Sequence, residues 1–369
     1  MEGSKQVDIT SSVPNNSATL EGRIVGSLLG LMVGDALGLP YEGISSRRIK
    51  KLVKSRLKHN LVFGRGMVSD DTEHAVMTAA SLGACWGEWD RFQSSLAWRL
   101  RWWFLRLPAG IGLATGRSII KLWIGFPAKY SGVFSAGNGP VMRAPIIGVS
   151  LGDQPSVMKQ VVKGSTEITH TDPKANVASL AIAQASYMAS QSKNVTMESY
   201  RTALSSLFVE EDEKSVSEFE TLLDKIEQHQ DEQVFAQSLG QEKGISGYSY
   251  HTVPMVIFLW LKYQDDYAAA MESMIKLGGD TDTTSAILGG VIGAAVGKNG
   301  IPQDWLVGIT DWPMTVSYVE KVALRLSHCK KANIKQGSGF LPGPLVFVRN
   351  MVFLAIVLVH GFRRLLPPY

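Results

Sequence analysis

Apolar residues recur at helical spacing along most of this chain. Because one face of an α-helix returns every three to four residues, apolar side chains at that interval predict helices that bury one side. Long stretches of alternating apolar and polar residues, which are typical of half-buried strands, are scarce. The pattern predicts an all-α fold with helices over residues 20–37, 73–86, 92–105, 156–162, 175–190, 197–208, 216–229, 253–263, 267–277 and 284–296.

Two of these predicted helices carry glycine at every fourth position: Gly22, Gly26, Gly30 and Gly34 in the first, and Gly289, Gly293 and Gly297 in the last. Each glycine inside a helix costs about 1 kcal/mol relative to alanine, so a stripe of glycines indicates close packing. Any neighbouring helix satisfies that need. A sharper hypothesis is that the two striped helices pack against each other antiparallel, which places Asp35 and Glu42 beside Asp280 and Asp282.

The composition is that of an ordinary globular protein. Of 369 residues, 45% are hydrophobic and 19% are charged, which suffices for a sizeable core. No shift in composition marks a second domain, so we expect one all-α domain over residues 20–335, preceded by a polar, disordered tail (1–19) and followed by an apolar segment (336–369).

The apolar C-terminal segment is expected to be a helix docked on the domain or on a partner subunit, in a homo-oligomer. Peripheral membrane attachment through Arg363 and Arg364 is the alternative. Arg349 and Asn350 interrupt the segment, and only residues 351–359 are apolar without a break. That is about half of the ~20 residues needed to span a bilayer, so no transmembrane segment is predicted.

Charge and cysteine usage exclude some protein classes. The net charge is +4, and the one basic run, residues 47–58, is typical of a solvated helix face, so no specific nucleic-acid binding is expected. Cys85 and Cys329 lack CxxC spacing, which argues against a disulfide framework or a thiolate zinc site. With no apolar signal segment in the first twenty residues, a cytoplasmic location is expected.

Three short motifs concentrate carboxylates: Asp35 with Glu42, Asp70 with Asp71, and Asp280 with Asp282. The last two pairs each begin a predicted helix. One Asp at a helix start is usually an N-cap, which stabilises by about 1 kcal/mol, but capping does not explain a second carboxylate beside it. Together with the hydroxyls of Ser69, Thr72 and Thr283 they form an all-oxygen set, which suits Mg²⁺, Mn²⁺ or Ca²⁺. So many carboxylates favour two ions, about 4 Å apart.

A second group of candidates lies between the helices. The stretch Gly137-Asn138-Gly139-Pro140 is first a turn and second a loop that could cradle phosphate. His170, taken alone, is more simply a loop or core histidine.

Taken together, these motifs resemble the ADP-ribosylglycohydrolase family over roughly residues 20–300. The resemblance rests on Gly-Asp-Ala-Leu-Gly at 34–38, Asp-Asp-Thr at 70–72, Gly-Asn-Gly with Met142-Arg143, Thr169-His170, and Gly-Gly-Asp-Thr-Asp-Thr at 278–283. It implies a compact, single-domain orthogonal helical bundle around two divalent cations, Mg²⁺ or Mn²⁺.

The resemblance also implies roles for individual residues. Metal ligands would be Ser69, Asp70, Asp71, Asp280, Asp282 and Thr283; catalytic groups Glu42, Asp71 and Asp280; and substrate-binding residues Asp35, Ser135, Gly137, Asn138, Gly139 and His170. Three positions depart from the family pattern. Ser69 replaces the usual Thr but keeps a hydroxyl, Pro140 stiffens the phosphate loop, and Ala136 stands where some relatives have an aromatic residue.

The predicted reaction is hydrolysis at the anomeric C1″ of ADP-ribose, which releases ADP-ribose from an ADP-ribosylated protein side chain or small molecule. One alternative is a hydrolase that cleaves another glycosidic or ester bond of a nucleotide derivative at the same site. The other is a non-catalytic protein that kept the fold, as in the crystallins related to this family. The intact carboxylates argue against the second alternative.

Overall fold

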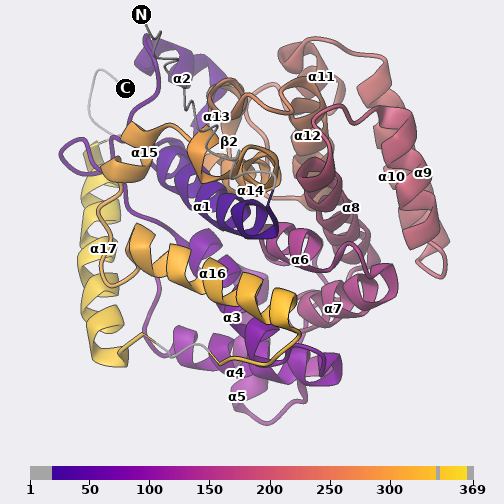
Figure 1. The fold of residues 1–369 in the computed structure, drawn as a ribbon. Coiled ribbons are helices and arrows are strands. Elements are labelled where there is room, and N and C mark those ends of the chain that lie inside the picture. Colours follow the sequence, from indigo (N-terminus) through magenta and orange to yellow (C-terminus); the bar gives the residue numbers. More distant parts are fainter. Residues whose placement is uncertain (1–18, 338–340, 364–369) are drawn as a thin grey trace, which may run out of the picture.

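The computed structural model describes residues 19–337 and 341–363, and this part of the chain is built almost wholly of helices (Figure 1). The predicted tail, residues 1–19, lies outside the described residues except for its last residue. The α-helices are α1 (Leu20–Gly38), α2 (Ser46–Leu52), α3 (Asp70–Ala84), α4 (Phe92–Phe104), α5 (Leu113–Trp123), α6 (Ala144–Leu151), α7 (Pro155–Glu167), α8 (Pro173–Gln191), α9 (Met197–Leu207), α10 (Glu213–Glu227), α11 (Glu232–Ser238), α12 (Ser249–Lys262), α13 (Tyr267–Leu277), α14 (Thr281–Gly300), α15 (Gln303–Gly308), α16 (Val316–Ala332) and α17 (Gly343–Arg363).

Short elements complete the described chain. The 3₁₀ turns are η2 (Leu39–Tyr41), η3 (Trp89–Arg91), η4 (Ala128–Tyr130) and η5 (Val141–Arg143). Two-residue strands β1 (Ile44–Ser45) and β2 (Gly278–Gly279) pair antiparallel, with Ile44 opposite Gly279. The all-α prediction is confirmed.

Helices α1 and α14 form the centre of the fold and run antiparallel in contact. A Cβ built on Gly30 would lie 2.2 Å from the carbonyl oxygen of Gly289, and one on Gly26 would lie 2.2 Å from that of Gly293. Such distances leave no room for a side chain. The two stripes therefore face each other, as the sharper hypothesis states. At Gly297 the backbone of α14 departs from helical geometry, with φ at +66°.

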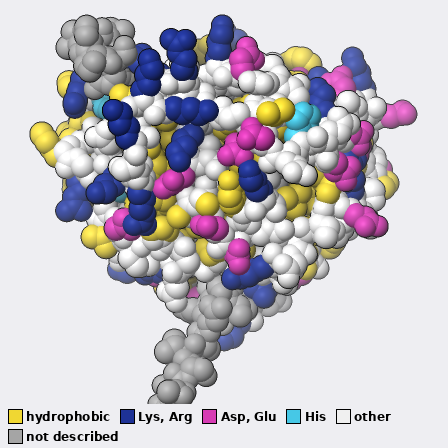
Figure 2. Space-filling view, turned by 90° about the horizontal axis from the view of Figure 1, so that it is seen from above, with side chains coloured by type: hydrophobic (Ala, Val, Ile, Leu, Met, Phe, Trp, Pro, Cys, Tyr) yellow, Lys and Arg dark blue, Asp and Glu magenta, His cyan; other side chains and the backbone are white. Residues whose placement is uncertain are grey.

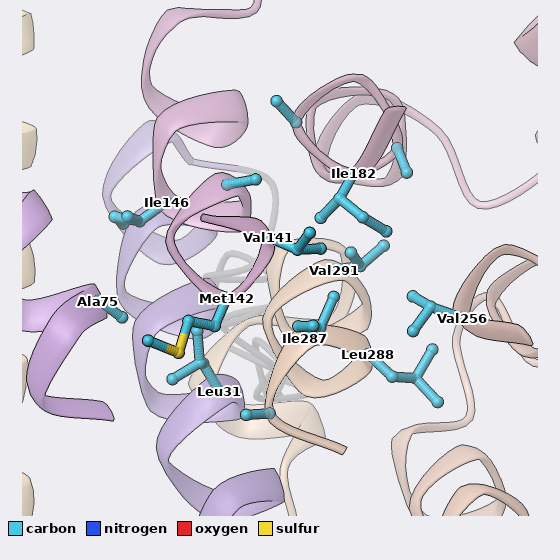
Figure 3. Close-up of a cluster of buried hydrophobic side chains, with 14 of the residues drawn as sticks. Leu31, Ala75, Val141, Met142, Ile146, Ile182, Val256, Ile287, Leu288 and Val291 are labelled. Carbon is cyan, nitrogen blue, oxygen red and sulfur yellow. The ribbon is translucent and has the colours of Figure 1, made fainter. Parts of the chain in front are cut away.

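Other helices surround this pair and enclose one continuous apolar core. Figure 3 shows side chains from several elements converging there, among them Leu31 of α1, Met142 of η5, Ile182 of α8 and Ile287 of α14. Helices α1 and α14 are buried on nearly all sides. This agrees with their sequences, which are apolar around the helix rather than amphipathic. The site-bearing ends of both helices are held in this rigid centre.

All ten predicted helices are present, with ends that differ from the predicted ones by at most a few residues. The predicted set lacks α2, α5, α6, α11, α15 and α16. Most of these are short, so their apolar periodicity spans only one or two turns. The exceptions are α5, which has 11 residues, and α16, whose buried Val319, Val322, Leu326 and Cys329 do have helical spacing.

The C-terminal apolar segment is a longer helix than the unbroken apolar run suggests. Arg349 and Asn350 lie inside α17 and are buried against the domain, so they do not interrupt the helix. By length and composition, α1 and α17 could each cross a membrane, but α1 is a core helix, whereas only 22% of the α17 stretch is buried. The absence of a transmembrane segment stays a prediction.

Candidate active site

The ends of three helices meet at one point of the fold. The last turn of α1 continues into η2 and Glu42, and the starts of α3 and α14 lie beside it. The hydroxyl of Thr281 donates to the carbonyl oxygen of Gly38 at 2.8 Å, and the amide of Gly43 donates to that of Gly279 at 2.7 Å. Residues more than 200 positions apart are thus joined by direct hydrogen bonds, as the antiparallel packing of α1 and α14 requires.

The paired aspartates do not serve as helix caps. The N-cap of α3 is Ser69, whose hydroxyl accepts from the amide of Asp71 at 3.3 Å. Asp280 precedes α14 without a side-chain capping bond, and its carboxylate instead accepts from the Asn138 side chain at 3.0 Å. Helix capping therefore does not explain why these carboxylates lie at the helix starts, and their oxygens require another explanation.

Asp35 occupies a different place from the expected one. Its carboxylate is fully buried and accepts hydrogen bonds from the amides of Ser69 (3.0 Å) and Thr72 (3.1 Å) and from the Thr72 hydroxyl (2.5 Å). Burial raises the pKa of Asp35 to about 6, although these donors act in the opposite direction. Asp35 fixes the start of α3 against α1 rather than lining the substrate cavity.

The remaining aspartates form a strongly electronegative cluster. Burial raises the pKa of Asp70, Asp71 and Asp282 well above the usual range, and the charges of neighbouring carboxylates raise it further. The pKa of Asp280 is also raised by burial. Like charges this close in a desolvated site repel one another unless protons or cations neutralise them.

Two buried carboxylate oxygens in this cluster lack a hydrogen-bond partner: Oδ1 of Asp71 and Oδ1 of Asp282. Buried charged oxygens without partners are costly, and a divalent cation would supply the missing interaction. Among the described residues, no three Asp, Glu, His or Cys side chains are already arranged as a complete ligand set. The donor chemistry nevertheless fits Mg²⁺ or Mn²⁺, which also accept hydroxyl oxygens such as those of Ser69 and Thr283 and retain water ligands.

The glycine-rich stretch around Asn138 borders this cluster. The side-chain amide of Asn138 donates both to Asp280 and, at 2.8 Å, to the hydroxyl of Thr252, and its main-chain amide donates to the carbonyl of Gly247 at 3.1 Å. Gly137 and Tyr248 form an isolated bridge. The loop is therefore tied both to the start of α12 and to the carboxylate cluster, which fixes its backbone beside the cavity.

His170 lies across from that loop. A Cβ on Gly139 would approach the His170 ring at 2.7 Å, so only glycine fits there. Burial, with a contribution from Arg143, lowers the pKa of His170 to about 3, so the ring is neutral. Arg143 itself is fully buried and donates to Ser165 and Thr169, and Thr169 in turn contacts His170 Nδ1 at 2.9 Å. This chain of contacts holds the imidazole in place.

A cavity of about 390 Å³ opens over the cluster. Eleven of the thirteen predicted site residues line it: Glu42, Ser69, Asp70, Ser135, Gly137, Asn138, Gly139, His170, Asp280, Asp282 and Thr283. Asp71 lies just behind them, with Oδ2 accepting from the Thr283 hydroxyl at 3.1 Å. Asp35 likewise does not line the cavity and contacts the lining residue Ser69.

Sequence reasoning missed two parts of the cavity wall. One is the segment of residues 109–115 before and into α5, which contributes Gly110, Gly112 and Thr115; its glycines and preceding Pro108 are a loop signal that could have been noticed. The other is Phe353 and Val357 of α17. No local pattern identifies these two residues, because only the tertiary docking of α17 brings them to the site.

Comparison with known proteins agrees with this geometry. A sequence model of the family described as ADP-ribosylglycohydrolase matches residues 16–334. An uncharacterised protein of Archaeoglobus fulgidus is 29% identical over 319 residues, which covers 83% of this chain and 96% of the relative. The ADP-ribosyl-[dinitrogen reductase] glycohydrolase of Rhodospirillum rubrum is 25% identical (78% and 90% covered), and the ADP-ribosylhydrolase ARH3 of Gallus gallus 26% (77% and 88%).

A solved structure described as an ADP-ribosylglycohydrolase-related protein complex superimposes with a TM-score of 0.60 at 22% identity. It covers 84% of this chain and 99% of the other. At that identity the likeness concerns the fold, which is the same all-α arrangement.

Proposed function

Since this chain belongs to the ADP-ribosylglycohydrolase family and is a hydrolase of glycosidic bonds, we propose that it removes ADP-ribose from an acceptor with two divalent cations bound between the starts of α3 and α14. The single observation that carries the proposal is the pair of buried, unpartnered carboxylate oxygens on Asp71 and Asp282. They belong to helices far apart in sequence, yet Thr283 of the second helix donates directly to Asp71 of the first.

The ligands would be oxygens from both helix starts: Ser69, Asp70 and Asp71 from one, and Asp280, Asp282 and Thr283 from the other. Mg²⁺ or Mn²⁺ suits this set, and bound cations of this kind orient hydroxyl groups and stabilise developing negative charge. The carboxylates contribute the negative potential that retains the cations. Asn138 donates to one oxygen of Asp280, whose carboxylate also interacts with Thr283 and Asp282; these partners would orient it toward a cation.

Glu42 is placed to act as the general base. It is exposed, lines the cavity, and lies close enough to Asp70 and Asp282 for its charge to raise the pKa of both. Water attacks C1″ as the bond to the acceptor breaks through an oxocarbenium-like state, and Glu42 takes the proton from that water. The departing acceptor leaves with the bonding electron pair and takes a proton from solvent water, which balances the proton accepted by Glu42.

The other cavity residues bind the substrate. Backbone amides around Gly137 and Gly139 are available to phosphate oxygens, and the neutral His170 offers a polar edge without a competing charge. We propose an ADP-ribosylated protein side chain or small-molecule conjugate as the substrate, and the cytoplasm as the site of action. The two named relatives with glycohydrolase or hydrolase activity are consistent with this substrate class.

The test is release of ADP-ribose from a panel of mono-ADP-ribosylated substrates in the presence of Mg²⁺ or Mn²⁺. Glu42→Gln should lower kcat by about 100-fold or more, because general bases typically contribute 10²–10⁴-fold. The exposed Glu198 on α9 provides a matched control, Glu198→Gln, which should keep full activity. Full turnover in Glu42→Gln would refute the assigned base, and full turnover in excess chelator would refute the cation site. No release from any substrate would favour a different nucleotide derivative or a non-catalytic relative.

A further inference from the structure

Helix α17 lies beyond residues 16–334, the part of the chain matched to the family, and docks on the domain by one face only. The Arg349 guanidinium contacts Asp311, Glu73 and the carbonyl of Val68, and the Asn350 amide donates to the carbonyl of Arg106 at 2.8 Å. Near its end, His360 contacts the carbonyl of Pro40 at 3.1 Å. These contacts hold the helix along its whole length.

The opposite face of α17 is apolar and exposed in the part of the chain that the structure describes. Its exposed side chains include Leu345, Val348, Val352, Leu358, Val359 and Phe362, of which Val359 is 69% and Phe362 67% exposed. A helix that is apolar all round is normally buried in protein or lipid, and a continuous apolar face of this length on a monomer marks an interaction site.

A loop packs beside the C-terminal half of α17, against the side of the helix that faces the domain. Leu61 and Met67 pack against Phe353, and Val62 joins the same cluster with Ile356 and Val357. At the tip of the loop, between Val62 and Arg65, Phe63 is completely exposed and has a left-handed backbone (φ +47°). The Phe63 side chain therefore packs against none of the residues that the structure describes.

The same loop and the helix before it are strongly basic. Between Glu42 and Asp70 the chain contains no Asp or Glu. Exposed cations here are Arg47, Lys50, Lys51, Lys54, Lys58 and Arg65, with Arg363 at the end of α17. Figure 2, which views the molecule from above, shows Lys and Arg side chains gathered on one half of that face. The apolar helix face, Phe63 and the basic side chains form what we call the α17 surface.

We propose that the α17 surface binds peripherally to a bilayer that contains anionic lipids. Apolar side chains with a cationic border are the combination that inserts into the interfacial region while neutralising acidic headgroups. A second copy of this chain fits less well. A two-fold dimer presents the same patch from both subunits, so its basic borders would face each other.

The experiment is vesicle flotation of the full-length protein with phosphatidylcholine vesicles, and with vesicles in which part of that lipid is phosphatidylserine. We expect co-flotation with the anionic vesicles and release by high salt. The double variant Val359→Gln/Phe362→Gln and the single variant Phe63→Ser should each reduce the bound fraction, the double variant by about tenfold or more. Lys58→Glu should lower it by about fivefold or more, since each basic residue near the surface contributes roughly that factor.

Two matched controls alter side chains of the same types elsewhere. Val209→Gln, between α9 and α10, and Lys214→Glu on α10 change exposed residues remote from α17 (Figure 1), and both should float as the unmodified protein does. Equal flotation of the α17-surface variants and the controls would overturn the proposal. So would a dimer in light scattering that dissociates in Val359→Gln/Phe362→Gln while no vesicle binding is seen, or vesicle attachment that resists both salt and alkaline extraction, as a spanning helix would.

Discussion

The Oδ2 atom of Asp71 accepts a hydrogen bond of 3.1 Å from the hydroxyl of Thr283, a residue 212 positions later in the chain. This bond joins the start of α3 to the start of α14 at the floor of the cavity. The two starts meet because the glycine stripe of α1 lets α14 approach to backbone contact. The spacing of the carboxylates therefore depends on helix packing well away from the chemistry.

Gly30 tests that dependence. A Cβ at this position would lie 2.2 Å from the carbonyl oxygen of Gly289 and 3.0 Å from the Cα of Gly293, and backbone cannot yield as a flexible side chain can. Gly30→Ala should destabilise the fold by about 3 kcal/mol or more, the upper range for overpacking, and lower activity as α14 is displaced. Urea unfolding measures the change. Gly361 on α17 has open space around it, so Gly361→Ala should be neutral or slightly stabilising. Equal stability of the two variants would contradict the packing account.

Arg349 is the buried charge that fixes α17 to the body of the protein. Its side chain is 4% exposed, and it contacts two carboxylates that are equally buried, those of Glu73 and Asp311. Arg349→Met leaves both carboxylates without their cation and should cost about 3–5 kcal/mol. The exposed pair of Arg56 and Asp304 offers a comparison, because Arg56→Met should cost no more than about 1 kcal/mol. Chemical denaturation measures both losses. Similar losses in the two variants would show that the buried contacts of Arg349 contribute no more to the free energy of unfolding than the exposed pair of Arg56 and Asp304.

His74 provides a pH test of stability. It is fully buried, its Nδ1 faces the Arg143 guanidinium at 3.2 Å, and burial together with the Arg143 charge holds its pKa well below the usual 6.5. Below pH 6.5 the unfolded chain therefore binds a proton at His74 that the folded protein does not bind. As far as His74 is concerned, the free energy of unfolding is highest above pH 6.5 and decreases as the pH falls. Tm should decline less steeply between neutral and acidic pH in His74→Gln than in the unmodified protein.

The raised pKa values of the buried carboxylates change the stability with pH in the opposite direction to His74. Because the variants and the unmodified protein share these carboxylates, their effect cancels when the Tm curves are compared. His328, which is exposed on α16, gives the control His328→Gln, which should follow the unmodified curve. Parallel curves for all three proteins would contradict a neutral, buried His74.

Much of the fold could be predicted from sequence because its signals are local. Apolar spacing located the ten principal helices. The glycine stripes predicted close packing, and the structure shows that of the alternatives the two striped helices pack against each other. Helices such as α6 and α11 are too short for periodicity to distinguish them from loops. The C-terminal segment was expected to form a helix, but sequence alone could not show that Arg349 and Asn350, which interrupt its apolar run, are buried against the domain.

The site could be predicted where the residue types and their spacing indicate a particular chemistry. Paired aspartates at helix starts, glycine beside Asn138, and His170 are uncommon combinations, and the structure brings them to one cavity. Asp35 shows the limit, because a carboxylate predicted to bind substrate instead accepts hydrogen bonds from backbone amides at the start of α3. Phe353 could not be found either, since an apolar residue in an apolar helix carries no mark of where that helix docks.

The central claim is that carboxylates from α3 and α14 jointly bind divalent cations. Titration of Mn²⁺ into the metal-free protein, followed by calorimetry, tests it directly, with Asp282→Asn as the variant and the exposed Asp265→Asn as the control. We predict binding of two ions per chain to the unmodified protein and to the control, with affinity reduced by at least about 100-fold in Asp282→Asn, since even an outer partner of a ligand typically contributes 10–100-fold. Equal Mn²⁺ binding by all three proteins, or none by the unmodified protein, would contradict the account.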